Sequence, residues 1–241
     1  MARDLKRIAE CGFTGVLLHL PPEYLEHTLD KRDRYAEFVR IADSLSLKIV
    51  FMVAPLHGLE GSGVAESGAL AAWLINSSLQ SSPALYRVRG KPLALCHSSI
   101  RMSGPRHPAI VFQRFSKDSL DWKWRPPLDP KRLQSPGTAT CSVIYTGWKG
   151  TRSTVEGGWA LPRGKWCENL RGELWRAFSA KSRRIVVSSW NDFQNGDAAE
   201  PNDIDGTKAS DVLTEEIRRV KLACSPSTTS SGTTGDSAAR Q

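Results

Sequence analysis

The feature that most constrains this chain is an alternation between short apolar segments and longer segments with apolar residues at helical spacing. Thr14–Leu20 and Lys48–Ala54 are apolar strand candidates, and the second is rich in branched residues. Between them, Lys31–Leu45 places its apolar residues on one face of a helix. Strands that alternate with helices form parallel sheets with both faces covered. The pattern therefore predicts βαβ units and an α/β fold.

The same alternation continues along the chain. We expect further helices at Arg3–Cys11, Glu66–Leu79, Glu168–Ser179 and Asp211–Lys221, and further strands at Leu93–His97, Ile110–Phe115, Thr140–Tyr145 and Arg184–Ser189. The first helix is expected to stop at Gly12, and Tyr86–Pro92 to form a turn. Lys117–Pro136 has no clean period and is expected to be a long loop. This order of elements suits a barrel or a doubly wound fold.

Length and composition favour one globular domain. A chain of 241 residues is close to the roughly 250 residues of a typical α/β barrel. We expect one domain over residues 1–222. The tail, residues 223–241, is mostly Ser, Thr, Gly and Ala from Ser225 onward, so it cannot repay its ordering entropy and is expected to be disordered.

Charge and cysteine usage narrow the function classes. The formal charge is +8, but the basic residues are scattered and form no long block, so we expect no nucleic-acid partner, whereas an acidic glycan stays compatible. The five cysteines contain no Cys-x-x-Cys pair. Metal ligation is therefore not expected, and Cys96 and Cys141 are interpreted as small buried hydrophobes in a reducing compartment.

No segment of the sequence predicts export or membrane insertion. The first thirty residues lack the pattern of a signal peptide, and no apolar run approaches the roughly 18 residues that span a bilayer. As written, the chain is expected to be cytoplasmic, without membrane contact. An incomplete N-terminus would leave its location open.

Polar residues gather where the last predicted strand ends. The apolar run Arg184–Ser189 is followed at once by Trp190, Asn191 and Asp192, and in α/β barrels the chemistry lies at the carboxyl ends of the strands. Asp192 can accept a proton or stabilise positive charge on a sugar ring, Asn191 can bind a hydroxyl group, and Trp190 can stack on a sugar face. A helix cap or a turn would also explain Asn and Asp here.

Other side chains near predicted strand ends are weaker candidates for substrate contact. His57 and His19 each follow or end an apolar run, but a histidine without an identifiable partner more often has a structural role. Tyr145 and Trp148, just after a strand, can form a platform for a sugar.

The segment from Trp190-Asn191-Asp192 to Glu200-Pro201 resembles the last motif of family 99 glycoside hydrolases and related bacterial polysaccharide-biosynthesis proteins. Family 71 α-glucanases carry a similar Trp-Asn-Asp segment. Weaker similarities lie at Tyr86–Pro92 and Pro162–Trp175. The resemblance implies a (β/α)8 TIM-type barrel of the endo-α-mannosidase or α-glucanase type. It also implies a glycan or oligosaccharide as partner, and neither a metal nor an organic cofactor.

The resemblance places a carboxylate at only one of the two catalytic positions of the family. In family 99, two carboxylates three residues apart serve as base and acid, and they align with Asp192 and Asn195. An amide cannot protonate a leaving oxygen, and losing a general acid typically lowers the rate ~100- to 10,000-fold. Either Glu200 or another carboxylate replaces the acid, or an activated leaving group needs none, or the chain binds sugar without cleaving it. Glu200 has a simpler alternative role in bracing its loop.

Family barrels begin with a strand, whereas here Met1 is followed at once by the match to the first helix. The expectation is a truncated barrel that lacks its first strand, with unpaired backbone at an open edge through which chains could associate.

The sequence thus predicts a glycoside hydrolase-like protein that acts on an α-linked glycan by carboxylate-assisted hydrolysis, with a degenerate acid position. The catalytic candidates are Asp192 and Glu200, and the substrate-binding candidates are Trp190, Asn191, Asn195, His57, Tyr145 and Trp148. The alternative is a catalytically silent pseudoenzyme that binds glycan or assists polysaccharide biosynthesis.

Overall fold

The computed structural model describes residues 2–21, 29–54, 64–66, 78–97, 101–103, 107–115, 142–145, 166–179, 184–188, 190–191, 199–201 and 206–224. The α-helices in these ranges are α1 (Ala2–Glu10), α3 (Leu29–Ser44), α5 (Trp166–Ser179) and α6 (Lys208–Cys224), and η1 (Ser78–Ser81) is a 3-10 helix. The strands are β1 (Gly15–Leu20), β2 (Lys48–Val53), β3 (Val64–Glu66), β4 (Arg87–Val88), β5 (Lys91–His97), β6 (Arg101–Ser103), β7 (Val111–Phe115), β8 (Ser142–Tyr145) and β9 (Ile185–Ser188).

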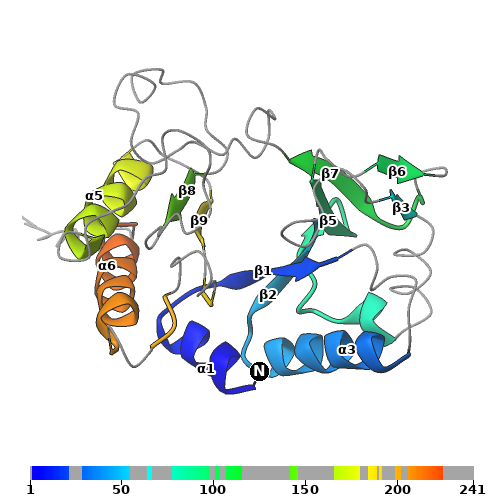
Figure 1. Cartoon of the computed structure of the whole chain (residues 1–241), viewed down its shortest axis with the longest axis horizontal. Helices are drawn as coiled ribbons and strands as arrows, with labels where there is room; N and C mark the ends of the chain where they lie inside the picture. The colour runs from blue at the N-terminus through cyan, green and yellow to red at the C-terminus, as the bar shows by residue number, and fades with distance from the viewer. Residues whose placement is uncertain are drawn as a thin grey trace, which may run out of the picture.

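The main sheet confirms the predicted parallel arrangement. β1, β2, β5 and β7 pair in this order and all run parallel, while the short β4 pairs antiparallel with β5. β8 and β9 form a second parallel pair, and β3 and β6 a third. Figure 1 shows α1 and α3 along one side of β1 and β2, with α5 and α6 beside β8 and β9. The architecture is therefore α/β, with helices packed on parallel strands.

In β1, β2, β5, β7 and β9, alternate residues belong to different cores, as the two-residue period of a strand requires. On one face of β1, Val16, Leu18 and Leu20 belong to the core that the helices α1 and α3 cover. On the other face, Leu17 packs in an interior core. That interior core has the buried residues Val50, Leu93 and Leu95, and the partly buried Leu17, Met52, Ala54, Tyr86, Val88, Val111 and Val186 pack against it. It thus joins the main sheet to β9.

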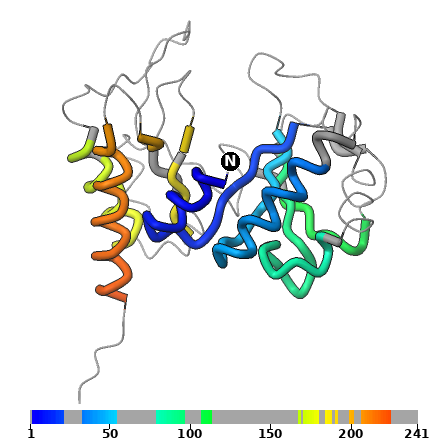
Figure 2. The backbone as a smooth tube through the Cα atoms, turned by 90° about the horizontal axis from the view of Figure 1, so that it is seen from below, coloured from blue at the N-terminus to red at the C-terminus, as the bar shows by residue number. Residues whose placement is uncertain are grey.

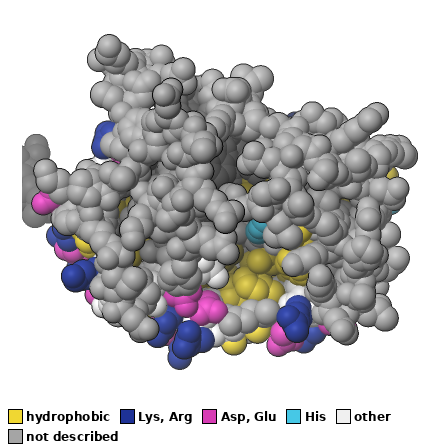
Figure 3. Space-filling view, in the orientation of Figure 1, with side chains coloured by type: hydrophobic (Ala, Val, Ile, Leu, Met, Phe, Trp, Pro, Cys, Tyr) yellow, Lys and Arg dark blue, Asp and Glu magenta, His cyan; other side chains and the backbone are white. Residues whose placement is uncertain are grey.

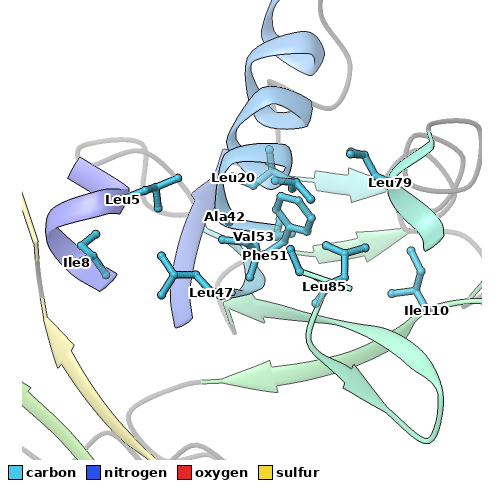
Figure 4. Close-up of a cluster of buried hydrophobic side chains, with 14 of the residues drawn as sticks. Leu5, Ile8, Leu20, Ala42, Leu47, Phe51, Val53, Leu79, Leu85 and Ile110 are labelled. Carbon is cyan, nitrogen blue, oxygen red and sulfur yellow. The ribbon is translucent and has the colours of Figure 1, made fainter. Parts of the chain in front are cut away.

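The helix-covered core lies between α1, α3 and the main sheet (Figure 4). Leu5 and Ile8 of α1 and Ala42 of α3 meet Phe51 and Val53 of β2 there. Phe51 is 1% exposed, and fully burying such a side chain stabilises the fold by about 1.5–3 kcal/mol. We call this the first outer core.

A second outer core lies between α5, α6 and β9. Its buried members are Leu170, Leu174, Ala177, Ala199, Ala209, Val212 and Leu213. Ile185 and Val187 of β9 pack on it, while Val186 between them faces the interior core. β9 is therefore covered on both faces, as the apolar run Arg184–Ser189 predicted.

In Figure 2 the helix α1 lies between α6 and α3, and the turn that follows it contacts α6. Gly12, which follows α1, has a φ of 88°, and its amide donates to the Ala9 carbonyl at 2.9 Å, so the predicted stop at this glycine is confirmed. A Cβ at Gly12 would lie 3.2 Å from Ile217 of α6, and Lys221 Nζ donates to the Gly12 carbonyl at 2.7 Å. Gly12 thus meets both conformational and packing requirements.

A buried carboxylate holds α5 to α6. Glu216 is fully buried, and its Oε2 accepts a hydrogen bond of 2.8 Å from Trp175 Nε1. Its Oε1 accepts from Arg171 Nε at 3.2 Å and from Arg219 at 3.1 Å. Glu215 binds the same two arginines from a more exposed position. The charge of Glu216 is therefore compensated by hydrogen-bonded partners, as a buried carboxylate requires.

Two predictions about local structure have definite outcomes. The turn at Tyr86–Pro92 is confirmed, because Arg89 (φ 52°) and Gly90 (φ 76°) form the left-handed pair of a tight hairpin between β4 and β5. The helix predicted to begin at Glu66 is wrong at its start, because Glu66 ends β3, which pairs with β6. Sequence periodicity does not record this distant strand pairing, which overrides local helical spacing.

Other predictions lie outside the described residues. These are the long loop Lys117–Pro136, Cys141 and the tail from Ser225 onward. Among the described cysteines, Cys96 and Cys11 are buried, as expected for Cys96. Burial raises the pKa of the Cys11 thiol. No helix among the described residues is long and apolar enough to cross a membrane.

We predict that Glu216→Ala lowers the free energy of unfolding by about 3 kcal/mol, because it leaves the Trp175 indole Nε1 without its acceptor and opens a cavity between α5 and α6. Glu215→Ala is the matched control on the same helix, and its loss should stay below about 1 kcal/mol, since its pairs are partly exposed. Urea denaturation of both variants measures the difference. Equal losses would contradict the assigned role of Glu216.

A second prediction concerns Glu173 of α5. Burial raises the pKa of its carboxyl, and the attraction of Arg176, 2.5 Å away, offsets this only in part. A raised pKa in the folded state stabilises the protein below the ordinary carboxyl pKa, and this contribution is lost as pH rises through the folded pKa. Glu173→Gln should therefore raise the melting temperature relative to wild type at pH 7 and lose this advantage near pH 4. A pH-independent difference would argue against this cause.

Candidate functional site

The predicted site lies where the parallel strands end. Leu20 and Val53 are paired at the carboxyl ends of β1 and β2, and Tyr145 is paired with Ser188 at the ends of β8 and β9. Trp190 and Asn191 follow β9 directly. Because parallel strands bring their carboxyl ends to one edge, the side chains beyond these ends are the ones that can share a ligand.

Trp190 joins the two outer cores. Its half-buried side chain packs against both of them. Among the described residues, Phe13, just after α1, is the only other one that packs against both. The indole Nε1 is buried and has no hydrogen-bond acceptor within the described ranges. The ring thus fills the space between the layers of α1 and α6, and its packing alone explains a large residue here.

Glu200 returns to Trp190 through the backbone. The Glu200 amide donates to the Trp190 carbonyl at 2.7 Å, and Ala199 beside it is buried in the second outer core. The Glu200 carboxylate, whose side chain is 13% exposed, lies 3.8 Å from the Arg3 guanidinium of α1. This contact connects the segment after β9 to α1.

The other predicted site residues are only partly visible. Asn191 is exposed just beyond Trp190. Tyr145 ends β8, but its side chain is not described. Asp192, Asn195, His57 and Trp148 lie outside the described residues. The structure therefore brings together Trp190, Asn191 and Glu200.

His19 is better placed than its sequence context indicated. It lies on the same face of β1 as Leu17, which packs in the interior core, and near the carboxyl end of the strand. Its Nε2 lies 2.8 Å from the Ala54 carbonyl oxygen, and its own carbonyl accepts a hydrogen bond from Tyr35 at 2.9 Å. His19 is thus held firmly at the end of β1.

Gln113 is a polar residue that the sequence analysis did not single out. The strand registers connect His19 to Met52, Met52 to Leu95, and Leu95 to Gln113, so these four residues form one row across the main sheet. In Val111-Phe112-Gln113, the alternation already places Gln113 on the face of Val111. A polar residue on the interior face of an apolar strand was the available signal.

Among the described residues, no group of three or more His, Cys, Asp or Glu side chains could hold a metal ion. The polar atoms near the strand ends are an imidazole, amides and a carboxylate. Such a set can donate to and accept from hydroxyl groups, and is suited to a polyhydroxylated ligand.

We predict that Trp190→Ala lowers the free energy of unfolding by about 3 kcal/mol, because it leaves a cavity between the two outer cores. Trp190→Phe keeps a ring and removes the buried Nε1, so its loss should be about 1 kcal/mol. Urea denaturation gives both values. If phenylalanine is as destabilising as alanine, an interaction of the indole nitrogen is essential.

Comparison of the whole fold identifies similar proteins. No family model matches the sequence, and neither does any curated protein sequence. Two solved structures of the family 99 endo-α-mannosidase from Bacteroides thetaiotaomicron are similar, one of them in complex with Bis-Tris propane. The complex has a TM-score of 0.64 and 11% identity, covering 92% of this chain and 83% of that one. The other structure has a TM-score of 0.64 and 12% identity, covering 92% of this chain and 80% of that one. At this identity, the likeness shows that the fold is shared.

Proposed function

We propose that this protein is a glycoside hydrolase-like protein that acts on an α-linked glycan at the carboxyl ends of its parallel strands. The observation that carries the proposal is the position of Trp190-Asn191 directly after β9, in a fold shared with family 99 endo-α-mannosidases. In such folds, the segments after the strands carry the reacting groups.

Asp192 follows the exposed Asn191 in sequence and is the proposed base or electrostatic stabiliser. Asn191 is proposed to bind a sugar hydroxyl, as are Asn195 and His57, while Trp148 and Tyr145 are proposed sugar contacts. Trp190 is proposed both to support this segment and to border the sugar. Its packing against the two outer cores supports the first of these roles.

We also infer that the strands close into a (β/α) barrel rather than an open sheet. Leu17 of β1 and Val186 of β9 pack against one interior core, although the two strands belong to different sheets. Within the described part of the chain, β1 pairs only with β2. On the face of the molecule that Figure 3 shows, apolar side chains are visible in the region of β1 and β2, with charged side chains of both signs on either side. Association through this edge stays a prediction.

A second candidate function is glycan binding without cleavage. In sequence, Asn195 occupies the position of the acid in the family 99 pattern. Glu200, the nearby carboxylate that could replace the acid, contacts Arg3 and is hydrogen-bonded to Trp190 through its backbone. A carboxylate engaged in this way holds the segment after β9 to α1. This geometry favours the binding function.

We predict that wild type hydrolyses aryl α-mannosides or α-glucosides with activated leaving groups, because such groups need no acid, and that Asp192→Asn lowers this rate at least about 100-fold. Asp211→Asn is the matched control, since Asp211 is exposed on α6 and contacts Thr207. Product release from a panel of aryl glycosides measures the rates. An unchanged rate in Asp192→Asn contradicts its assignment.

The two candidate functions are separated by a further variant. Asn195→Glu restores the second carboxylate and should increase hydrolysis of unactivated α-linked disaccharides if Asp192 is a competent base. If wild type and Asn195→Glu bind these disaccharides in calorimetry but cleave neither kind of substrate, the binding function is correct. If wild type neither binds nor cleaves any of them, both candidates are wrong.

A further inference from the structure

The interior of the strands changes in character along their length. The row Leu17, Val50, Leu93 and Val111 is apolar and packs in the interior core. The next row toward the carboxyl ends is His19, Met52, Leu95 and Gln113, in which polar groups stand at the two outer positions. Met52 and Leu95 at the centre of this row still pack in the interior core, so His19 is an interior-facing side chain at a polar outer position of the row.

The hydrogen bond of His19 determines which ring nitrogen carries a proton. The Ala54 carbonyl can only accept, so Nε2, at 2.8 Å from it, must be the donor. In the neutral ring, Nδ1 is then an acceptor. Nδ1 makes no hydrogen bond within the described part of the chain, and the side chain is only half-buried. The Tyr35 hydroxyl holds the backbone of the same residue through the His19 carbonyl at 2.9 Å.

We propose that His19 is a positioning and specificity-determining residue whose Nδ1 accepts a hydrogen bond from a hydroxyl group of the bound sugar. The proposal rests on the proposed glycan function and adds a fixed acceptor on the β1 side of the site. An acceptor held by two hydrogen bonds to neighbouring elements loses little entropy on binding. It discriminates against a sugar that lacks the matching hydroxyl, because Nδ1 then loses solvent contact without a partner.

The competing explanation is that His19 only connects β1 to β2 through Ala54. Two substitutions separate the explanations, because one keeps a polar group near the position of Nδ1 and the other keeps one near the position of Nε2. His19→Asn retains a polar acceptor near the position of Nδ1 but cannot reach the Ala54 carbonyl. His19→Gln retains a donor near the position of Nε2 but has no polar atom near Nδ1. His19→Ala removes both.

The experiment measures affinity for α-linked mannobiose and maltose by calorimetry, together with the melting temperature of each protein. If Nδ1 binds the sugar, His19→Ala and His19→Gln should weaken binding about threefold to tenfold, which is the loss of one neutral hydrogen bond. His19→Asn should keep an affinity within about twofold of wild type, even if its melting temperature falls. The reverse order, with glutamine restoring affinity and asparagine not, overturns the proposal in favour of the connecting role.

Monodeoxy derivatives of the disaccharide that binds wild type provide a readout that a connecting role would not change. One deoxy position should weaken binding to wild type but have no further effect on His19→Ala, because both changes remove the same hydrogen bond. If every deoxy position acts alike on the two proteins, the inference is wrong while the proposed function stands. If wild type binds neither disaccharide, both are wrong.

Discussion

Burial of the parallel strands on both faces is the constraint on which the rest of this structure depends. Each strand must supply one set of side chains to the helices and a second set to the interior, and β1, β2, β5 and β9 all do so in strict alternation. This requirement explains why β2 and β9 are apolar in most positions. It also explains why β9, which pairs with β8 rather than with the main sheet, nevertheless shares the interior core through Val186.

The same alternation positions the candidate site. A side chain at the end of a strand can face the interior only if it follows the interior-facing residues of that strand by an even number of positions. His19 satisfies this condition, since it follows Leu17 by two residues. Trp190 lies beyond its strand and packs instead on the two outer cores. A residue can therefore belong to a sequence motif and still have much of its side chain committed to packing.

The sequence predicted the elements with strong periodicity well. The strands at Thr14–Leu20 and Lys48–Ala54 and the helices beginning near Arg3, Glu168 and Asp211 are present with small shifts at their ends. Interactions between distant residues were not predictable. The pairing of β3 with β6, the clamp of Glu216 on Trp175 and the contact of Glu200 with Arg3 each join segments whose proximity only the fold establishes. The sequence named His19 only as a weaker candidate for substrate contact, because Ala54 and Tyr35 became its partners through folding.

These contacts also bear on whether a fold of this kind can lose hydrolysis and still bind sugar. Glycoside hydrolysis with a pair of carboxylates needs one of them to be protonated, whereas sugar binding needs only fixed donors and acceptors at the strand ends. The residues that hold His19 in place lie just after β2 and on α3, apart from the segment after β9. A change such as asparagine at position 195 would therefore remove proton donation without disturbing recognition on the β1 side. With the proposed roles of His19 and Asp192, recognition and catalysis would be physically separable, which is why glycan binding without cleavage is the proposed alternative to hydrolysis.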